Sequence, residues 1–153
     1  MTKEAIQDTW PHEGTFCFGC GKNNANGLQL KSYWEEDEAV ASWTPKDYHL
    51  AFPGIVNGGI IATLIDCHGT GTANAAAYRD AGDSPASFMF VTGSLSVRFL
   101  KPTPIGEPLT LRARVIEQRE RKMTVSCSVY AGGIECATGE VVAIRVDQTR
   151  FLH

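Results

Sequence analysis

The chain has no long hydrophobic run and no cluster of basic residues. None of its apolar stretches approaches the roughly 18 residues that a membrane-spanning helix needs. Lys and Arg number 14 against 17 Asp and Glu, the formal net charge is -3, and the basic residues are dispersed. These absences argue against a membrane protein and against nucleic acid as the main partner. The N-terminal residues also lack the apolar core of an export signal, so we expect a cytoplasmic protein.

Cysteine is sparse, and its pattern does not indicate a framework of disulfide bonds. The five cysteines are an odd number, and without an export signal we expect reduced thiols. Cys17 and Cys20 form one C-x-x-C pair, but a structural zinc needs four ligands, and no second C-x-x-C or H-x3-H pair follows. We therefore interpret both residues as small buried thiols in a turn-rich segment, and we expect no metal and no other cofactor.

The stretch PGIVNGGIIATLIDCHG, residues 53 to 69, contains the feature that most directly suggests chemistry. Its double glycine opens a helix that we predict to run from about Gly58 to Arg79. Asp66 lies in the apolar body of this helix, with no Lys or Arg within a turn. A carboxylate in such a place is costly unless it is paired, hydrogen-bonded or facing a cavity. A structural carboxylate held by hydroxyl or backbone donors is the alternative to a catalytic one.

The predicted start of this helix favours a developing negative charge. Gly58 and Gly59 would place free N–H groups at the positive end of the helix dipole. Taken alone, the two glycines also fit a tight turn and close helix packing. Eight residues at a rise of about 1.5 Å separate Gly58 from Asp66 by roughly 12 Å, so the two cannot share one site within a chain. A two-fold dimer, in which the Gly58 end of one helix meets Asp66 of the other, gives two complete sites.

Six strands are expected around this helix. Residues 28–34 and 38–45 predict a β-hairpin about an acidic turn. After the helix, a loop over residues 82–87 precedes four alternating segments, with breaks at residues 119–121 and 132–133. Two strands, one long helix and four more strands make an α+β arrangement, which we expect to form one domain over residues 1–153. The small residues at 69–77 would let a strongly curved antiparallel sheet approach the helix.

Three motifs follow one another along nearly the whole chain. The pattern C-F-x-C-G-x-x-N-x-x-G-L is present as Cys17, Phe18, Cys20, Gly21, Asn24, Gly27 and Leu28. The pattern P-G-x-V-H-G-G-x6-D stands as Pro53, Gly54, Val56, Asn57, Gly58, Gly59 and Asp66. The pattern T-x-x-L-x-V-x-F-L-x-P-x-P-x-G stands as Thr92, Leu95, Val97, Phe99, Leu100, Pro102, Pro104 and Gly106. In these motifs the chain resembles the hotdog-fold acyl-CoA thioesterases of the phenylacetate-pathway type.

The resemblance implies a curved antiparallel sheet wrapped around one central helix, and hydrolysis of an acyl-CoA thioester at a dimer interface. It implies that the Gly58 N–H binds the thioester carbonyl and that Asp66 of the other subunit acts as general base or nucleophile. It also implies that Thr92 holds water or the carboxylate. We expect a homo-oligomer that is at least a dimer, and a tetramer remains open.

One position departs from the motif, because the usual histidine is Asn57. Asn can cap the helix and hydrogen-bond a carbonyl oxygen, but it cannot titrate. His49, in the loop before the helix, either lines the site or is a surface histidine. His68 lies on a different helix face from Asp66, which favours a packing or interface role.

Further substrate-binding residues are expected around the dimer seam. Gly59 is a second amide donor at the helix start. Basic side chains near the nucleotide phosphates are expected among Arg98, Lys101, Arg119, Arg121 and Lys122. Taken individually, each of these five is better explained as a solvated surface charge.

Two other functions compete with thioester hydrolysis. An acyl-thioester dehydratase or hydratase shares the P-G-x-V pattern, but the hydratase-type D-x4-H is absent, because Phe52 stands five residues after Asp47. A binding module that keeps an acyl-CoA pocket without turnover is the other alternative, and the replacement of His by Asn57 is the observation behind it.

Overall fold

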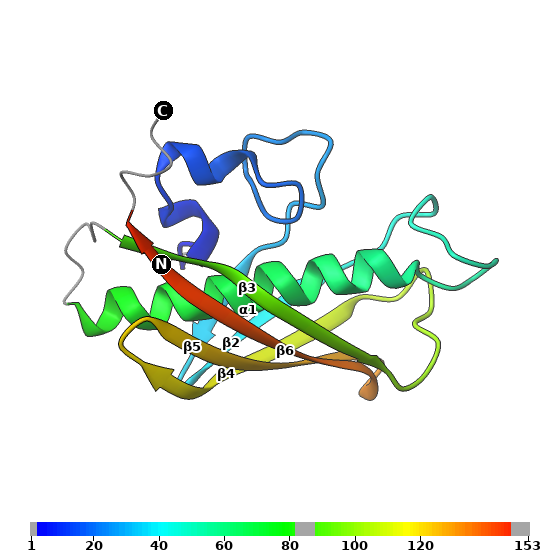
Figure 1. Ribbon diagram of the computed structural model, residues 1–153. Coiled ribbons are helices and arrows are strands. Elements are labelled where there is room, and N and C mark those ends of the chain that lie inside the picture. The colour runs from blue at the N-terminus through cyan, green and yellow to red at the C-terminus, as the bar shows by residue number, and fades with distance from the viewer. Residues whose placement is uncertain (1–2, 82–87, 148–153) are drawn as a thin grey trace.

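The computed structural model describes residues 3–81 and 88–147 (Figure 1). The loop expected at residues 82–87 lies outside this part of the chain. The described elements, in order, are the short 3-10 helices η1 (Ile6–Thr9) and η2 (His12–Phe16), strands β1 (Ser32–Glu35) and β2 (Glu38–Trp43), helix α1 (Gly58–Asp80), and strands β3 (Phe88–Phe99), β4 (Leu109–Arg119), β5 (Lys122–Ala131) and β6 (Ile134–Asp147).

The six strands form one antiparallel sheet that curves around α1. The order across the sheet is β1-β2-β4-β5-β6-β3, so β3 occupies the edge beside β6. Figure 1 shows the long helix lying along the sheet, with the N-terminal segment on the other side of the helix from β4 and β5. This arrangement is a hotdog fold, and it confirms the predicted fold. Among the described residues, no helix combines the length and the hydropathy that crossing a membrane takes.

The predicted turns and helix boundaries agree closely with the structure. Gly132 and Gly133 both have positive φ, 56° and 79°, and join β5 to β6. Two such residues favour a tight hairpin whose twist matches that of its strands. α1 begins at Gly58, as expected, and ends one residue beyond Arg79.

The first strand is shorter than the sequence suggests. Residues 28–34 alternate loosely, yet β1 begins only at Ser32. Gln29 adopts a left-handed conformation with φ 58°, which interrupts an extended strand. The N–H groups of Leu28 and Leu30 donate to the carbonyls of Phe18 and Gly19. These residues therefore hydrogen-bond to the N-terminal loop and do not extend the sheet.

Small residues bring α1 and β6 into close contact at two points. A Cβ atom at Gly69 of α1 would lie 2.5 Å from Val141 Cγ2 of β6. A Cβ atom at Gly139 of β6 would lie 2.5 Å from Ile65 Cγ2 of α1. Each glycine thus accommodates a branched side chain from the other element. The cost in helix propensity of a glycine in α1 is offset by this close packing.

Strand β3 exposes apolar side chains that its alternation predicts to be covered. Leu95 is 37% exposed and Phe99 is 55% exposed, although both alternate with polar neighbours. Among the described residues β3 pairs only with β6, so its other edge is open. An exposed apolar edge strand is a surface on which a second chain can pair.

Replacing Gly69 with Ala should destabilise the fold. Although alanine favours a helix by about 1 kcal/mol, the new methyl group meets Val141, and overpacking of this kind costs about 1 to 3 kcal/mol. The matched control is the double variant Gly69→Ala, Val141→Ala, which removes the opposing methyl groups. Chemical denaturation should show non-additive free energies of unfolding, with the double variant less destabilised than the sum of the two singles. Additive values would contradict the predicted contact.

Candidate functional site

Asn57 caps the helix that carries the site. Its Oδ1 accepts hydrogen bonds from the N–H groups of Gly59 at 2.8 Å and Ile60 at 3.2 Å. The Asn57 N–H in turn donates to the carbonyl of His49 at 2.9 Å, which ties the preceding loop to the helix start. Asparagine is well suited to this position because its side-chain oxygen satisfies N–H groups that lack a partner within the helix.

Gly58 is the first residue of α1, and its N–H donates to no protein acceptor within the described part of the chain. A Cβ atom here would lie 3.3 Å from the ring of Phe99, so the ring lies directly against this turn. At Gly59 a Cβ atom would lie 2.9 Å from the capping oxygen of Asn57. The helix start therefore presents one amide donor beside an exposed aromatic ring.

Asp66 is half-buried and accepts a hydrogen bond from one hydroxyl group, which is itself in contact with a second hydroxyl group. Thr92 Oγ1 donates to Asp66 Oδ1 at 2.6 Å. Thr70 Oγ1 lies 3.1 Å from Thr92 Oγ1. Because the single proton of Thr92 is used on Asp66, Thr70 is the donor in that second contact. The structure thus brings together two of the sequence-predicted residues, Asp66 and Thr92, and adds Thr70.

Asn74 fixes the position of the strand that carries Thr92. Its Nδ2 donates to the carbonyl of Phe90 at 2.9 Å, and its Oδ1 accepts from the Phe90 N–H at 2.8 Å. Neither Thr70 nor Asn74 was predicted from the sequence. Their signal was spacing, since residues 66, 70 and 74 recur every four positions and therefore share a helix face.

The surroundings of Asp66 favour its protonated form relative to a carboxylate in water. Burial raises the pKa of Asp66, the hydrogen bond from Thr92 lowers it, and the nearby Cys17 thiolate raises it further. Burial is the largest of these influences. A carboxyl group with a raised pKa is a better proton acceptor than one fully solvated in water.

Asp66 faces a cavity of about 260 Å³ between α1, the start of β3 and the N-terminal segment. Its polar lining includes Asp66, Thr70 and Thr92, and its apolar lining includes Trp10, Met89 and Phe90. Gly58 does not line it. The site residues therefore fall into two groups on one chain, the helix start and the Asp66 cavity.

The two histidines considered from sequence have different settings. His68 is completely buried, with Nδ1 2.7 Å from Ser32 Oγ and Nε2 2.9 Å from the carbonyl of Ala39, which confirms a packing role. Burial lowers the pKa of His68 to about 4, so the ring is neutral near pH 7. His49 accepts from the Lys46 N–H at 2.9 Å and packs against Trp43 and Tyr48. Burial and the charge of Lys46 lower the pKa of His49.

The basic residues lie at opposite ends of the helix. Arg98 lies near the end of β3 and Lys101 in the loop that follows it, and both are exposed. This loop lies next to the helix start, because its Thr103 carbonyl accepts from the N–H of Val56, just before α1, at 2.8 Å. Arg119, Arg121 and Lys122 belong to the β4–β5 turn, where Gln118 donates to Asp80 at the other end of α1. Only Arg98 and Lys101 therefore lie on the side of the Gly58 amide.

The interpretation of both N-terminal cysteines as buried is wrong for Cys17. Cys20 is 1% exposed, but the residue at position 17 is exposed, and its Sγ lies 3.7 Å from that of Cys67 on α1. Sequence spacing did not indicate this contact, because 50 residues separate the two cysteines.

Comparison with known proteins identifies the class. The model of the thioesterase superfamily matches residues 53–138, and the chain belongs to this family. A thioesterase superfamily protein from Shewanella loihica is 42% identical, with a TM-score of 0.65, over 80% of this chain and 96% of that one. No curated protein gives a significant match.

Two more distant structures share the fold. The PaaI protein from the phenylacetic acid degradation operon of E. coli is 19% identical, with a TM-score of 0.67, over 82% of this chain and 86% of that chain. A Streptococcus mutans protein solved with acetyl-CoA bound is 19% identical, with a TM-score of 0.64, over 77% of this chain and 89% of that chain.

Replacing Asn57 with Ala should remove the helix cap and lower the free energy of unfolding by about 1 kcal/mol. Asn57→Ser is the matched control, because serine supplies a capping oxygen and should retain most of the stability. Urea denaturation of the two variants beside the parent protein measures the difference. Equal stability of the Ala and Ser variants would contradict a capping role.

Proposed function

We propose that this protein is an acyl-CoA thioesterase that hydrolyses its substrate at a dimer interface. The observation that carries the proposal is the half-buried Asp66, hydrogen-bonded by Thr92 and open to a cavity. A carboxylate used only for structure would not need to face an open cavity. Membership of the thioesterase superfamily supports the same reaction class.

Thioester hydrolysis needs a proton acceptor for water and a donor for the carbonyl oxygen. In the proposed reaction, Asp66 takes a proton from water as the water attacks the carbonyl carbon, and Thr92 keeps the carboxylate in place. Negative charge then develops on the carbonyl oxygen. The Gly58 N–H, which has no acceptor among the described residues and lies at the positive end of the helix dipole, stabilises that charge. Collapse of the intermediate breaks the carbon–sulfur bond, and the proton held by Asp66 passes to the departing thiolate, so that coenzyme A leaves as the thiol and the acid is the other product.

The two groups must come from different subunits, because they lie on one helix and face different surroundings. The open edge of β3 carries Thr92 together with the exposed apolar residues Leu95 and Phe99. Phe99 also lies against Gly58. If the open edge of β3 pairs with a second copy about a two-fold axis, the exposed apolar side chains are covered. The same pairing would bring each Gly58 toward the Asp66 cavity of the other subunit.

The dimensions of the cavity suggest which part of the substrate it holds. At about 260 Å³ it is small for a whole coenzyme A ester, so we assign it to the acyl group, against Met89 and Phe90. The pantetheine arm would follow the subunit seam, with Arg98 and Lys101 toward the phosphates and Gly59 and His49 at the entrance. Acetyl-CoA in the Streptococcus mutans structure supports a coenzyme A ester as ligand. A single domain over residues 1–153 and a cytoplasmic location remain predictions.

Asp66→Asn should abolish thiol release from acyl-CoA substrates, because an amide cannot accept the proton from water. The assay is release of free coenzyme A from short, medium, long and aryl acyl-CoAs. Asp37→Asn is the matched control, since Asp37 is exposed in the β1–β2 turn, and it should keep the parental rate.

Two outcomes would overturn this assignment. Equal rates for Asp66→Asn and Asp37→Asn would remove Asp66 from the reaction. Tight acyl-CoA binding by the parent protein, with no thiol released from any ester, would identify the binding module. Loss of the conjugated absorbance of an enoyl-CoA without thiol release would instead identify a hydratase.

Gly58→Pro should lower kcat by about 10²- to 10³-fold, the usual effect of removing one oxyanion donor. Proline is tolerated at the first position of a helix, where its missing N–H breaks no helical bond. The preceding Asn57, at φ -57° and ψ 134°, has a backbone conformation compatible with a following proline. The matched control is Gly58→Ala, which adds a Cβ beside Phe99 but keeps the N–H. Similar kcat values for the two variants would contradict the oxyanion role.

A further inference from the structure

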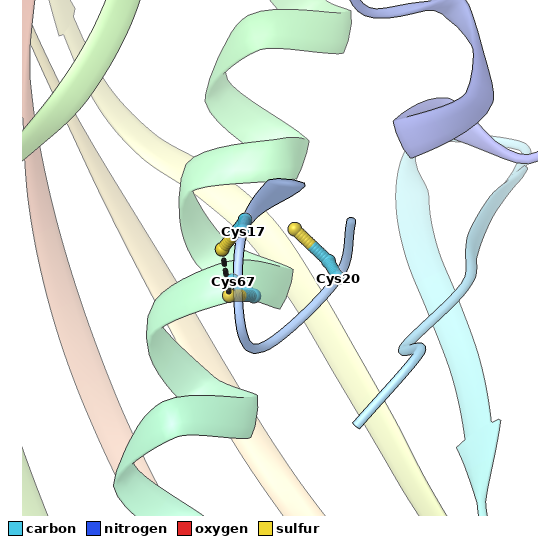
Figure 2. Close-up of side chains that lie close together, drawn as sticks. All are labelled: Cys17, Cys20 and Cys67. Atoms are coloured by element: carbon cyan, nitrogen blue, oxygen red, sulfur yellow. Dashed lines mark hydrogen bonds between the residues drawn. The ribbon is translucent and has the colours of Figure 1, made fainter. Parts of the chain in front are cut away.

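Three cysteines from two distant parts of the sequence meet beside the Asp66 cavity. Cys17 and Cys20 come from the loop after η2, and Cys67 projects toward them from α1 (Figure 2). The Sγ atoms of all three lie within 4.8 Å of one another, and those of Cys17 and Cys67 are 3.7 Å apart. The proposed hydrolysis does not use any of them.

These separations fit a metal-thiolate site. Zinc–sulfur bonds of about 2.3 Å in a tetrahedral site place two sulfurs about 3.8 Å apart. The 3.7 Å between the Cys17 and Cys67 sulfurs is close to this value, and the Cys20 sulfur lies within 4.8 Å of both. A disulfide needs the sulfurs at about 2.05 Å, which is much further from the observed geometry.

The loop that carries Cys17 and Cys20 is held in place before any ligand binds. The N–H of Gly21 donates to the carbonyl of Cys17 at 2.8 Å, and the N–H of Leu30 donates to the carbonyl of Gly19 at 3.0 Å. A Cβ atom at Gly19 would lie 2.3 Å from the Cys67 sulfur, so only glycine allows the helix thiol to reach the loop. The sequence therefore provides both the ligands and the space between them.

We propose that Cys17, Cys20 and Cys67 bind one thiophilic metal ion, zinc in the first place, as three thiolate ligands. Three soft thiolates select zinc over magnesium or calcium. All three cysteines line the cavity, so the fourth position faces it and is taken by water. Binding releases the thiol protons to solvent. The ion would fasten the N-terminal loop to α1 one residue from Asp66, and so fix one wall of the cavity.

The sequence predicts no metal, because a second ligand pair is absent. The third ligand is a single cysteine on the helix, 47 positions beyond Cys20, where no spacing rule points to it. The fold supplies this ligand by packing α1 against the N-terminal loop.

The test is titration of the reduced, metal-free full chain with Co²⁺ and then with Zn²⁺, under a non-thiol reductant. We expect one equivalent of Co²⁺ to give the sulfur-to-metal charge-transfer band and the intense ligand-field bands of a tetrahedral thiolate site. One equivalent of Zn²⁺ should displace it, protect three thiols from a thiol reagent and raise the Tm. Cys67→Ala and Cys17→Ala should lose the spectrum, whereas Cys127→Ala, in β5, should keep it.

The exposed position of Cys17 makes Cys17→Ala the safer variant, because its fold does not depend on burying that side chain. Circular dichroism confirms that each variant is folded before titration. Absence of the cobalt spectrum in the parent protein would overturn the proposal. An undiminished spectrum in folded Cys17→Ala, or formation of a Cys17–Cys67 disulfide with no metal uptake before or after reduction, would do so as well. None of these readouts depends on thioester hydrolysis.

Discussion

The close packing of α1 against the curved sheet fixes the position of every group at the site. The helix and β6 approach closely at two points. Gly69 of the helix lies against the branched side chain of Val141 in β6, and Gly139 of β6 lies against that of Ile65 in the helix. This contact sets the rotation of α1, and with it the face on which Asp66, Thr70 and Asn74 lie. Asn74 then holds the backbone of Phe90, which places Thr92 within 2.6 Å of Asp66.

The same helix carries, at separate places, the two groups that the proposed reaction needs. Its first turn offers an amide donor at Gly58, and its middle offers a carboxylate that faces a cavity. In the proposed reaction, one chain contains both groups but cannot apply them to one substrate. The exposed apolar residues of β3 are consistent with this division, because they lie where a second copy would complete the site.

Features that depend on local sequence could be predicted well. The helix start at Gly58, the cap at Asn57 and the turn at Gly132 and Gly133 all follow from residue types that favour those conformations, and the structure agrees. The six strands and their order of appearance follow from alternation. The resemblance implied that Thr92 holds either water or the carboxylate, and a hydrogen bond from Thr92 to Asp66, 26 residues away in sequence, is present.

Features that depend on contacts between distant elements could not be predicted. Strand β1 begins only at Ser32, because the backbone N–H groups of Leu28 and Leu30 donate to the N-terminal loop. The meeting of Cys67 with Cys17 needs the loop to fold back on the helix. Leu95 and Phe99 are exposed, although their alternation with polar residues predicts that these side chains are buried within a single chain.

The most direct test of the account is activity in a mixed oligomer made from two inactive parents. One parent carries Gly58→Pro and the other Asp66→Asn, and differently tagged copies are co-expressed so that only mixed dimers are purified. In each mixed dimer one site combines both changes and the other combines an intact Gly58 with an intact Asp66 from the opposite subunit. The account predicts recovery of about half the parental activity per dimer. Mixed dimers as inactive as their parents would show that the two groups do not cooperate across the interface, and would contradict the account.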